Sequence, residues 1–258
     1  MRPFLVSFGG LRIASAPVFA GLAALASYFY FERRKKALGL TDEDFWGLIA
    51  ALAFGAFAGA IGFYMVAYGG GPARNLARIL QTRNIAGGSF LGTYLGAALS
   101  AFAYCRARRL PFAPAGDALG GAAPLGLSVM RVGCLLNGCC FGKPTSLPWG
   151  IVYHGPSGVP GSMREIPLHP TQVYESLGAL LIFLLVDRVA RPRIEAGRMR
   201  PGDGLAVSVG LYAVLRFFVD FLRAGDPGVL APLGFSLAQW IATAAALASA
   251  TRFVRRKA

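Results

Sequence analysis

The chain has 258 residues, of which 55% are hydrophobic and 15% are charged, and its formal net charge is +14. Soluble domains average about 45–50% apolar and about 25% charged residues, so this composition excludes an ordinary soluble domain and a disordered chain. The positive charge fits either nucleic-acid binding or basic loops beside membrane spans, and the positions of the charges decide between them.

Seven apolar stretches have about the 20 residues that a helix needs to cross a membrane. They occupy residues 12–31, 45–67, 86–104, 118–137, 170–186, 204–222 and 235–254. The sequence therefore predicts an all-α, polytopic integral membrane protein with about seven transmembrane helices. We expect residues 1–258 to form a single membrane domain.

Basic residues are unevenly divided between the two sides of these stretches. Sixteen of the 26 Lys and Arg residues lie after the first, third, fifth and seventh stretches. Positive charge marks the cytoplasmic side, which predicts an N-terminus outside and a cytoplasmic C-terminus. Four separate basic segments do not make one contiguous basic face, so no nucleic-acid partner is expected. The longest outer loop, residues 138–169, is expected to carry part of a functional site.

A few ionisable residues fall inside the apolar stretches, where charges are costly and mark functional sites by default. Arg216, Asp220 and Arg223 follow i, i+4, i+7 spacing, so they share one helix face. Arg131 lies near the end of the fourth stretch and Glu175 near the start of the fifth. All five map to the outer half of the predicted membrane domain.

Two interpretations of this polar set remain open at the level of sequence. Guanidinium groups bind phosphate bidentately, so Arg131, Arg216 and Arg223 could line a site for a phospholipid headgroup. Alternatively, salt bridges such as Arg131–Asp220 and Arg216–Glu175 could simply hold the helices together.

Three segments carry a more specific pattern. Residues 131–150 read Arg-Val-Gly-Cys-Leu-Leu-Asn-Gly-Cys-Cys-Phe-Gly-Lys-Pro-Thr-Ser-Leu-Pro-Trp-Gly, and residues 169–175 read His-Pro-Thr-Gln-Val-Tyr-Glu. Residues 215–223 add Leu-Arg-Phe-Phe-Val-Asp-Phe-Leu-Arg. In this order and on these predicted helices, the segments resemble the bacterial prolipoprotein diacylglyceryl transferases.

The resemblance implies a multi-pass enzyme of the bacterial cytoplasmic (inner) membrane. Such an enzyme transfers diacylglycerol from phosphatidylglycerol to the cysteine thiol in the lipobox of a prolipoprotein and releases glycerol phosphate. The implied partners are therefore the donor lipid, the prolipoprotein acceptor and the membrane. No metal and no other cofactor is expected.

The resemblance also implies roles for individual residues. The implied catalytic residues are His169, Glu175, Arg131 and Arg216. The implied substrate-binding residues are Arg223, Asp220, Asn137, Gly142, Gln172 and Tyr174. In this interpretation the arginines hold the headgroup, Asp220 balances their charge, and His169 with Glu175 orients or deprotonates the acceptor. Gly142 would let the backbone approach the headgroup closely.

The chain departs from the family pattern at several polar positions. Cys134 stands where the family usually has Asn, and Cys139 where it usually has Glu. Leu91 occupies the region of a usual His or Tyr, Ala14 that of a usual Tyr, and Ile61 that of a usual Arg. The expected source of thiol activation is therefore missing, which leaves the exact reaction open.

The cysteines near the outer side allow several roles. Cys139 or Cys140 could be a nucleophile, or Cys134 could form a disulfide with either of them, or all three could simply pack. Their spacing does not suit a structural zinc site. Two other functional hypotheses therefore stand beside the favoured transferase. One is a divergent enzyme on the same frame with another acceptor or cysteine-based chemistry, and the other is a non-catalytic lipid-binding membrane protein.

Overall fold

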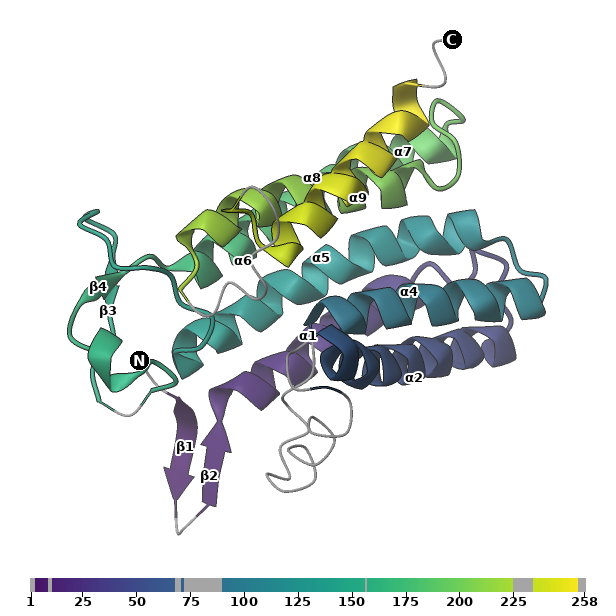
Figure 1. Cartoon of the computed structure of the whole chain (residues 1–258). Coiled ribbons are helices and arrows are strands. Elements are labelled where there is room, and N and C mark those ends of the chain that lie inside the picture. Colours follow the sequence, from purple (N-terminus) through teal and green to yellow (C-terminus); the bar gives the residue numbers. More distant parts are fainter. Residues whose placement is uncertain are drawn as a thin grey trace. The chain divides into compact units, whose positions relative to one another are not determined.

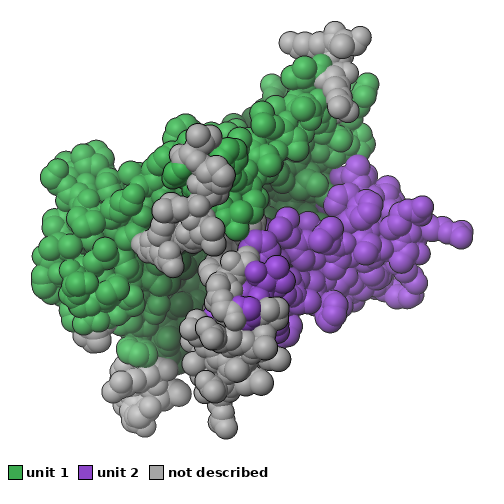
Figure 2. Space-filling view, in the orientation of Figure 1, with its two compact units in different colours: residues 1–33, 116–258 green, residues 34–115 purple. Residues whose placement is uncertain are grey.

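The computed structural model describes residues 3–8, 11–67, 71, 90–155, 157–224 and 234–254. It divides into two compact units, which Figure 2 distinguishes by colour. The first comprises residues 1–33 and 116–258, and the second comprises residues 34–115. Each unit is described by itself.

A helix overlaps each of the seven predicted apolar stretches. The helices are α1 (Ser15–Glu32), α2 (Asp42–Ala67), α4 (Phe90–Ala107), α5 (Phe112–Asn137), α6 (Thr171–Leu185), α8 (Asp203–Leu222) and α9 (Leu237–Val254). Within the described part of the chain, three helical segments are long and apolar enough to cross a membrane: Asp42–Val66, Phe112–Asn137 and Asp203–Leu222. The mainly helical prediction is thus confirmed.

The prediction of a purely helical chain is wrong at the N-terminal segment, which contains two strands. Strands β1 (Phe4–Phe8) and β2 (Leu11–Ala14) form an antiparallel hairpin, and α1 therefore begins at Ser15 rather than at residue 12. The backbone N–H of Ser15 donates to the carbonyl of Pro3, 2.9 Å away. A Gly-Gly pair between two short apolar runs is a hairpin signal, which a search for 20-residue apolar stretches overlooks.

In the first unit, α6, α8 and α9 lie side by side (Figure 1). The chain leaves α6 through a single π-helical segment, η3 (Val186–Ala190), and the short α7 (Arg191–Glu195). Asp117 of α5 accepts the backbone N–H groups of Gly202 and Leu205 at 2.6 and 3.0 Å. This carboxylate satisfies N–H groups that the first turn of α8 leaves without helical partners, and it fixes α8 against α5.

In the second unit, α2 and α4 pack backbone to backbone. A Cβ added at Gly55 would collide with Ser100 and the Gly96 carbonyl, and one added at Gly59 would collide with the Gly92 carbonyl. The Ser100 hydroxyl also donates to the Ala51 carbonyl at 2.7 Å. Small residues at such a crossing let two helices approach closely, which is how helices associate without a hydrophobic driving force in lipid.

Residues 138–155 and 157–169, the predicted outer loop, pack around an apolar core of their own. Tyr153, Val159 and Leu168 form its buried apolar core. Short strands β3 (Ile151–Val152) and β4 (Pro167–Leu168) pair antiparallel, with a 3₁₀ turn, η2 (Gly161–Met163), between them. This fold places the residues that flank α6 beside the C-terminal end of α8, where most of the predicted site residues gather.

Candidate functional site

Glu175 lies at the centre of three arginines. Its side chain is fully buried near the start of α6, and its Oε2 is 3.0 Å from Arg131 Nε and 3.4 Å from Arg223 Nη1. Its Oε1 is 3.5 Å from Arg216 Nη1. The sequence-predicted pair Arg216–Glu175 is thus confirmed, whereas Arg131 pairs with Glu175 instead of Asp220. The helices α5, α6 and α8 meet at this carboxylate.

Asp220 completes the set, which we call the arginine cluster: Arg131, Arg216, Arg223, Glu175 and Asp220. Its Oδ1 accepts from Arg216 Nη2 at 2.6 Å, one turn apart on α8. Its Oδ2 accepts from the Ser236 hydroxyl, which also holds the first turn of α9. Three guanidinium groups and two carboxylates leave the cluster with a net charge of +1.

Tyr212 points into the same cluster and was missed by sequence reasoning. It precedes Arg216 by four residues and Asp220 by eight, so it continues their helix face. Its charge interactions are with Glu175 and all three arginines. Its hydroxyl oxygen is buried and has no hydrogen-bond partner within the described part of the chain. The i, i+4, i+8 spacing of Tyr212, Arg216 and Asp220 in the sequence could have identified Tyr212 as a site residue.

A backbone ladder joins the outer loop to both neighbouring helices. The Gly142 N–H donates to the His169 carbonyl at 2.9 Å, and the His169 N–H donates to the Lys143 carbonyl at 2.9 Å. The Lys143 N–H donates to the carbonyl of Leu222, the last residue of α8, at 2.8 Å. A Cβ at Gly142 would lie 2.5 Å from His169 Cβ and 2.7 Å from the Leu222 oxygen. Gly142 is therefore required for this close approach of two chain segments.

His169 lies beside Tyr174 rather than in a pair with Glu175. Its Nδ1 is 3.3 Å from the Tyr174 hydroxyl, and the two rings meet edge to face at 6.2 Å. Trp149 Nε1 donates to the same hydroxyl at 2.7 Å. Among the described residues, Glu175 makes its ion pairs with the three arginines.

The first turn of α6 fixes the backbone of the cysteine segment. The buried Gln172 donates through Nε2 to the Cys139 carbonyl at 2.8 Å and to the Tyr153 hydroxyl at 3.0 Å. The Thr171 hydroxyl donates to the Cys140 carbonyl at 2.7 Å. Burial raises the pKa of Tyr153, so this phenol remains a neutral member of the network. Gln172, which was predicted to bind substrate, therefore also positions the backbone of the cysteine segment.

Asn137 is the last residue of α5, and its carbonyl accepts the Gly158 N–H at 3.0 Å. Gly138 then adopts a φ of +75°, a left-handed conformation that suits glycine and ends the helix. Asn137 therefore ties the end of α5 to the folded outer loop.

Cys134, Cys139 and Cys140 form a second group, which we call the thiol cluster. All three cysteines are free, and their Sγ atoms lie within 4.8 Å of one another. Hydrogen bonds from the other two thiols lower the pKa of Cys140, and the charges on Arg223 and Arg131 lower it further. The three thiols converge because of the turn that ends α5, which the separation of the cysteines along the chain does not show.

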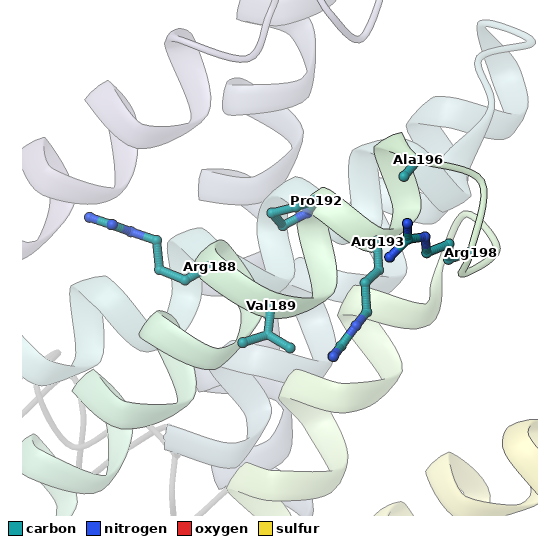
Figure 3. A pocket seen from close by; sticks show the side chains of 6 residues that line it. All are labelled: Arg188, Val189, Pro192, Arg193, Ala196 and Arg198. Carbon is teal, nitrogen blue, oxygen red and sulfur yellow. The ribbon is translucent and has the colours of Figure 1, made fainter.

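A separate cavity of about 220 Å³ lies past the C-terminal end of α6, where residues of η3, of α7 and of the segment after α7 line it. Figure 3 shows its lining, which includes Arg188, Arg193 and Arg198. The 15 residues of α6 correspond to roughly 22 Å of helix, so this basic cavity and the arginine cluster are distinct features.

Comparison with known proteins gives a consistent result. A family model described as prolipoprotein diacylglyceryl transferase matches residues 3–255. The chain is similar to three proteins, each named phosphatidylglycerol–prolipoprotein diacylglyceryl transferase. The one from Geobacter sulfurreducens is 32% identical over 212 residues, covering 80% of this chain and 75% of the relative. The one from Rhodospirillum rubrum is 31% identical over 261 residues, covering 98% and 91%. The one from Clostridium tetani is 28% identical over 229 residues, covering 88% and 87%.

Proposed function

The chain belongs to the prolipoprotein diacylglyceryl transferase family, and from this membership we propose how its own residues carry out the transfer. The enzyme moves the diacylglyceryl group of phosphatidylglycerol to a prolipoprotein, at the thiol of the lipobox cysteine. The observation that carries this proposal is the arginine cluster, a largely buried site with a net charge of +1. A phosphodiester carries one negative charge, so it would neutralise the cluster.

The donor phosphate binds at Arg131, Arg216 and Arg223, with Glu175 and Asp220 holding the guanidinium planes in place. Arginine suits this role because its donors form a fixed fork that matches phosphate oxygens. The Tyr212 hydroxyl, which is buried beside the same charges, supplies a further donor to the phosphate. Each of these donors is already oriented, so little reorganisation is needed when negative charge develops.

In the transfer, the acceptor sulfur, after losing its proton, attacks as a thiolate the glyceryl carbon that bears the phosphate ester oxygen. A C–S bond forms, the C–O bond breaks, and its electron pair leaves with glycerol phosphate. The departing phosphate gains a second negative charge. The arginine cluster stabilises that charge more strongly than it stabilises the bound diester, which is the differential binding that lowers a barrier.

The acceptor side is formed by the outer loop and the start of α6. His169, Tyr174 and Trp149 form a connected polar and aromatic group there. We assign His169 to orienting the acceptor and Gln172 to holding the cysteine segment. Asn137 and Gly142 shape the loop around both substrates, through the helix end and the backbone ladder described above.

The enzyme is a multi-pass protein of the bacterial cytoplasmic membrane in this proposal. Seven helices span the bilayer as one membrane domain, with the N-terminus outside, the C-terminus in the cytoplasm, and residues 138–169 on the outer side. The uneven distribution of the 26 Lys and Arg residues supports this orientation. The arginine cluster then lies in the outer half of the bilayer, at the depth of lipid headgroups.

A transfer assay tests this function. Purified full-length protein in detergent is mixed with labelled phosphatidylglycerol and a peptide carrying a lipobox cysteine, and we expect label on the peptide. Arg216→Lys should lower kcat/KM about tenfold, because lysine keeps the charge and loses the bidentate fork. Arg193→Lys, in the separate basic cavity, is the matched control and should transfer normally.

Full transfer by Arg216→Lys would mean that Arg216 serves only as an ion-pair partner. If the wild-type protein bound phosphatidylglycerol without turning it over, the chain would be a lipid-binding protein and not a transferase.

Tyr212→Phe tests the additional phosphate donor. We expect kcat/KM to fall about tenfold, the effect of one hydrogen bond to a charged group, with the helix content unchanged. Tyr28→Phe, on α1 and outside the arginine cluster, is the matched control. If Tyr212→Phe transferred at the same rate as the control, Tyr212 would not be a phosphate donor.

A further inference from the structure

The family reaction needs a reactive thiolate on the acceptor, yet the nearby carboxylates are already occupied. Glu175 is bound by three arginines, and Asp220 is bound by Arg216 and Ser236. These contacts use all four oxygen atoms of the two carboxylates. The thiol cluster, whose thiols the proposed function does not use, lies next to the arginine cluster, because the charges of Arg131 and Arg223 act on Cys140.

The geometry of the thiol cluster suits one metal ion. Zinc binds cysteine sulfur at about 2.3 Å in tetrahedral geometry, so two sulfurs on one ion lie about 3.8 Å apart. The three Sγ atoms are already within 4.8 Å of one another. Shortening these separations by about 1 Å or less would therefore bring all three sulfurs onto a single ion.

The backbone that carries these cysteines is held from two sides. The Cys139 N–H donates to the Cys134 carbonyl at 3.1 Å across the end of α5. The carbonyls of Cys139 and Cys140 accept from Gln172 and Thr171 of α6. Cys140 adopts a φ of +60°, a conformation that non-glycine residues rarely keep unless the surroundings enforce it. These contacts preorganise the three sulfurs, as a metal site requires.

Charge and coordination number favour zinc with an open position. Among the described residues, the group of potential metal ligands consists of these three cysteines, without a fourth histidine, cysteine or carboxylate. Three protein ligands and one open position are the pattern of catalytic zinc sites. Three thiolates and Zn²⁺ carry a net charge of −1, and the positive charges of Arg131 and Arg223 act on this group at Cys140. The cysteines are half-buried, so a substrate sulfur can reach the ion.

We propose that Cys134, Cys139 and Cys140 bind one Zn²⁺ ion, and that its fourth position binds the acceptor cysteine as a thiolate. This inference rests on the proposed function and adds the means of thiol activation. It also gives a chemical reason for cysteine at the two positions, 134 and 139, where the family usually has asparagine and glutamate.

The step balances in atoms and charge. The acceptor thiol loses its proton to water as its sulfur coordinates zinc, because coordination deprotonates a thiol outright. The bound thiolate attacks the glyceryl carbon, the C–S bond forms, and the C–O bond breaks with its electron pair leaving on glycerol phosphate. The thioether product is neutral and binds zinc weakly, so it leaves the fourth position. Nothing is oxidised or reduced.

Metal content is the first test. Full-length protein is purified in detergent with zinc, passed through a desalting column, and analysed by mass spectrometry for bound metal. We expect one zinc per chain in the wild type and in Cys105→Ala, the matched control in α4 outside the thiol cluster. Cys139→Ser and Cys140→Ser should each lose at least about tenfold in zinc affinity while keeping the wild-type helix content.

Cobalt substitution then tests the open position without using the donor lipid. Co²⁺ in place of zinc gives a thiolate-to-metal charge-transfer band whose intensity rises with the number of bound thiolates. Adding the lipobox peptide should raise this band about 1.3-fold, from three thiolates to four. A peptide with serine in place of its cysteine should leave the band unchanged.

Several outcomes would overturn the proposal. Two concern metal content: the wild-type protein contains no zinc, or zinc persists in the Cys139→Ser variant. The other two are a cobalt spectrum that does not change when the peptide thiol is added, and a disulfide within the cluster detected by thiol titration. The proposed function fails separately. Zinc and a peptide response without lipid transfer would refute the donor assignment only, whereas transfer by metal-free protein would refute the zinc site only.

Discussion

Glu175→Gln is expected to destabilise the protein by about 3–5 kcal/mol and to abolish transfer. The substitution keeps the shape of the side chain and removes the negative charge that faces Arg131, Arg216 and Arg223 within 3.0 to 3.5 Å. Three guanidinium groups would then remain around a fully buried neutral amide. Their mutual repulsion should separate α5, α6 and α8 at this point.

Thermal unfolding in one detergent, followed by helix content, measures the loss of stability. Glu195→Gln is the matched control, because Glu195 pairs with Arg191 at 3.0 Å on an exposed helix surface. Exposed pairs of this kind contribute about 0.3–0.5 kcal/mol, so the control should unfold almost as the wild type does. Equal unfolding temperatures for both variants would show that Glu175 does not hold the cluster together.

Gly142→Ala is expected to lower kcat/KM about a hundredfold, the scale of loss when reacting groups are displaced by about 1 Å. The new methyl group would lie 2.5 Å from His169 Cβ, 2.6 Å from the His169 carbonyl oxygen and 2.7 Å from the Leu222 oxygen. Two of these three atoms belong to the main chain, so no side-chain rotation relieves the overlap. The ladder between the loop and α8 must open, and it would carry Arg223 away from Glu175.

Gly161→Ala is the matched control for this prediction. Gly161 lies in the same outer loop, its φ is not in the left-handed region, and a Cβ there would meet nothing within 4 Å. Its transfer rate should equal that of the wild type. A Gly142→Ala enzyme with the same rate as Gly161→Ala would mean that the ladder tolerates displacement and does not position the arginines.

The helices were predictable from sequence because their signal is local. Seven apolar stretches became seven helices, and the spacing correctly placed Arg216 and Asp220 on one face of α8. Arg223 was predicted on the same face, but α8 ends at Leu222 and Arg223 follows it in an extended conformation. The N-terminal hairpin was not predicted, because its strands have only 5 and 4 residues and are shorter than the pattern sought.

The partners within the site were only partly predictable, because they depend on how helices meet. The ion pair of Arg216 with Glu175 was anticipated. Arg131 also forms an ion pair with Glu175, and His169 forms a hydrogen bond with Tyr174. The thiol cluster depends on the turn after Asn137 and on hydrogen bonds from Thr171 and Gln172. Contacts between residues more than 30 positions apart leave no periodic trace in a single sequence.

The ladder at Gly142 and Lys143 also determines how this end of the molecule can open. These residues bond to His169 ahead of α6 and to Leu222 at the end of α8. Opening the loop here therefore breaks hydrogen bonds to both helix ends at once, so the loop base and the helix ends behave as one cooperative unit in local unfolding. Amide protons at 142, 143 and 169 would exchange with solvent in a single event. The rim of the loop, beyond this unit, is where entry of a bulky acceptor can be accommodated at low cost.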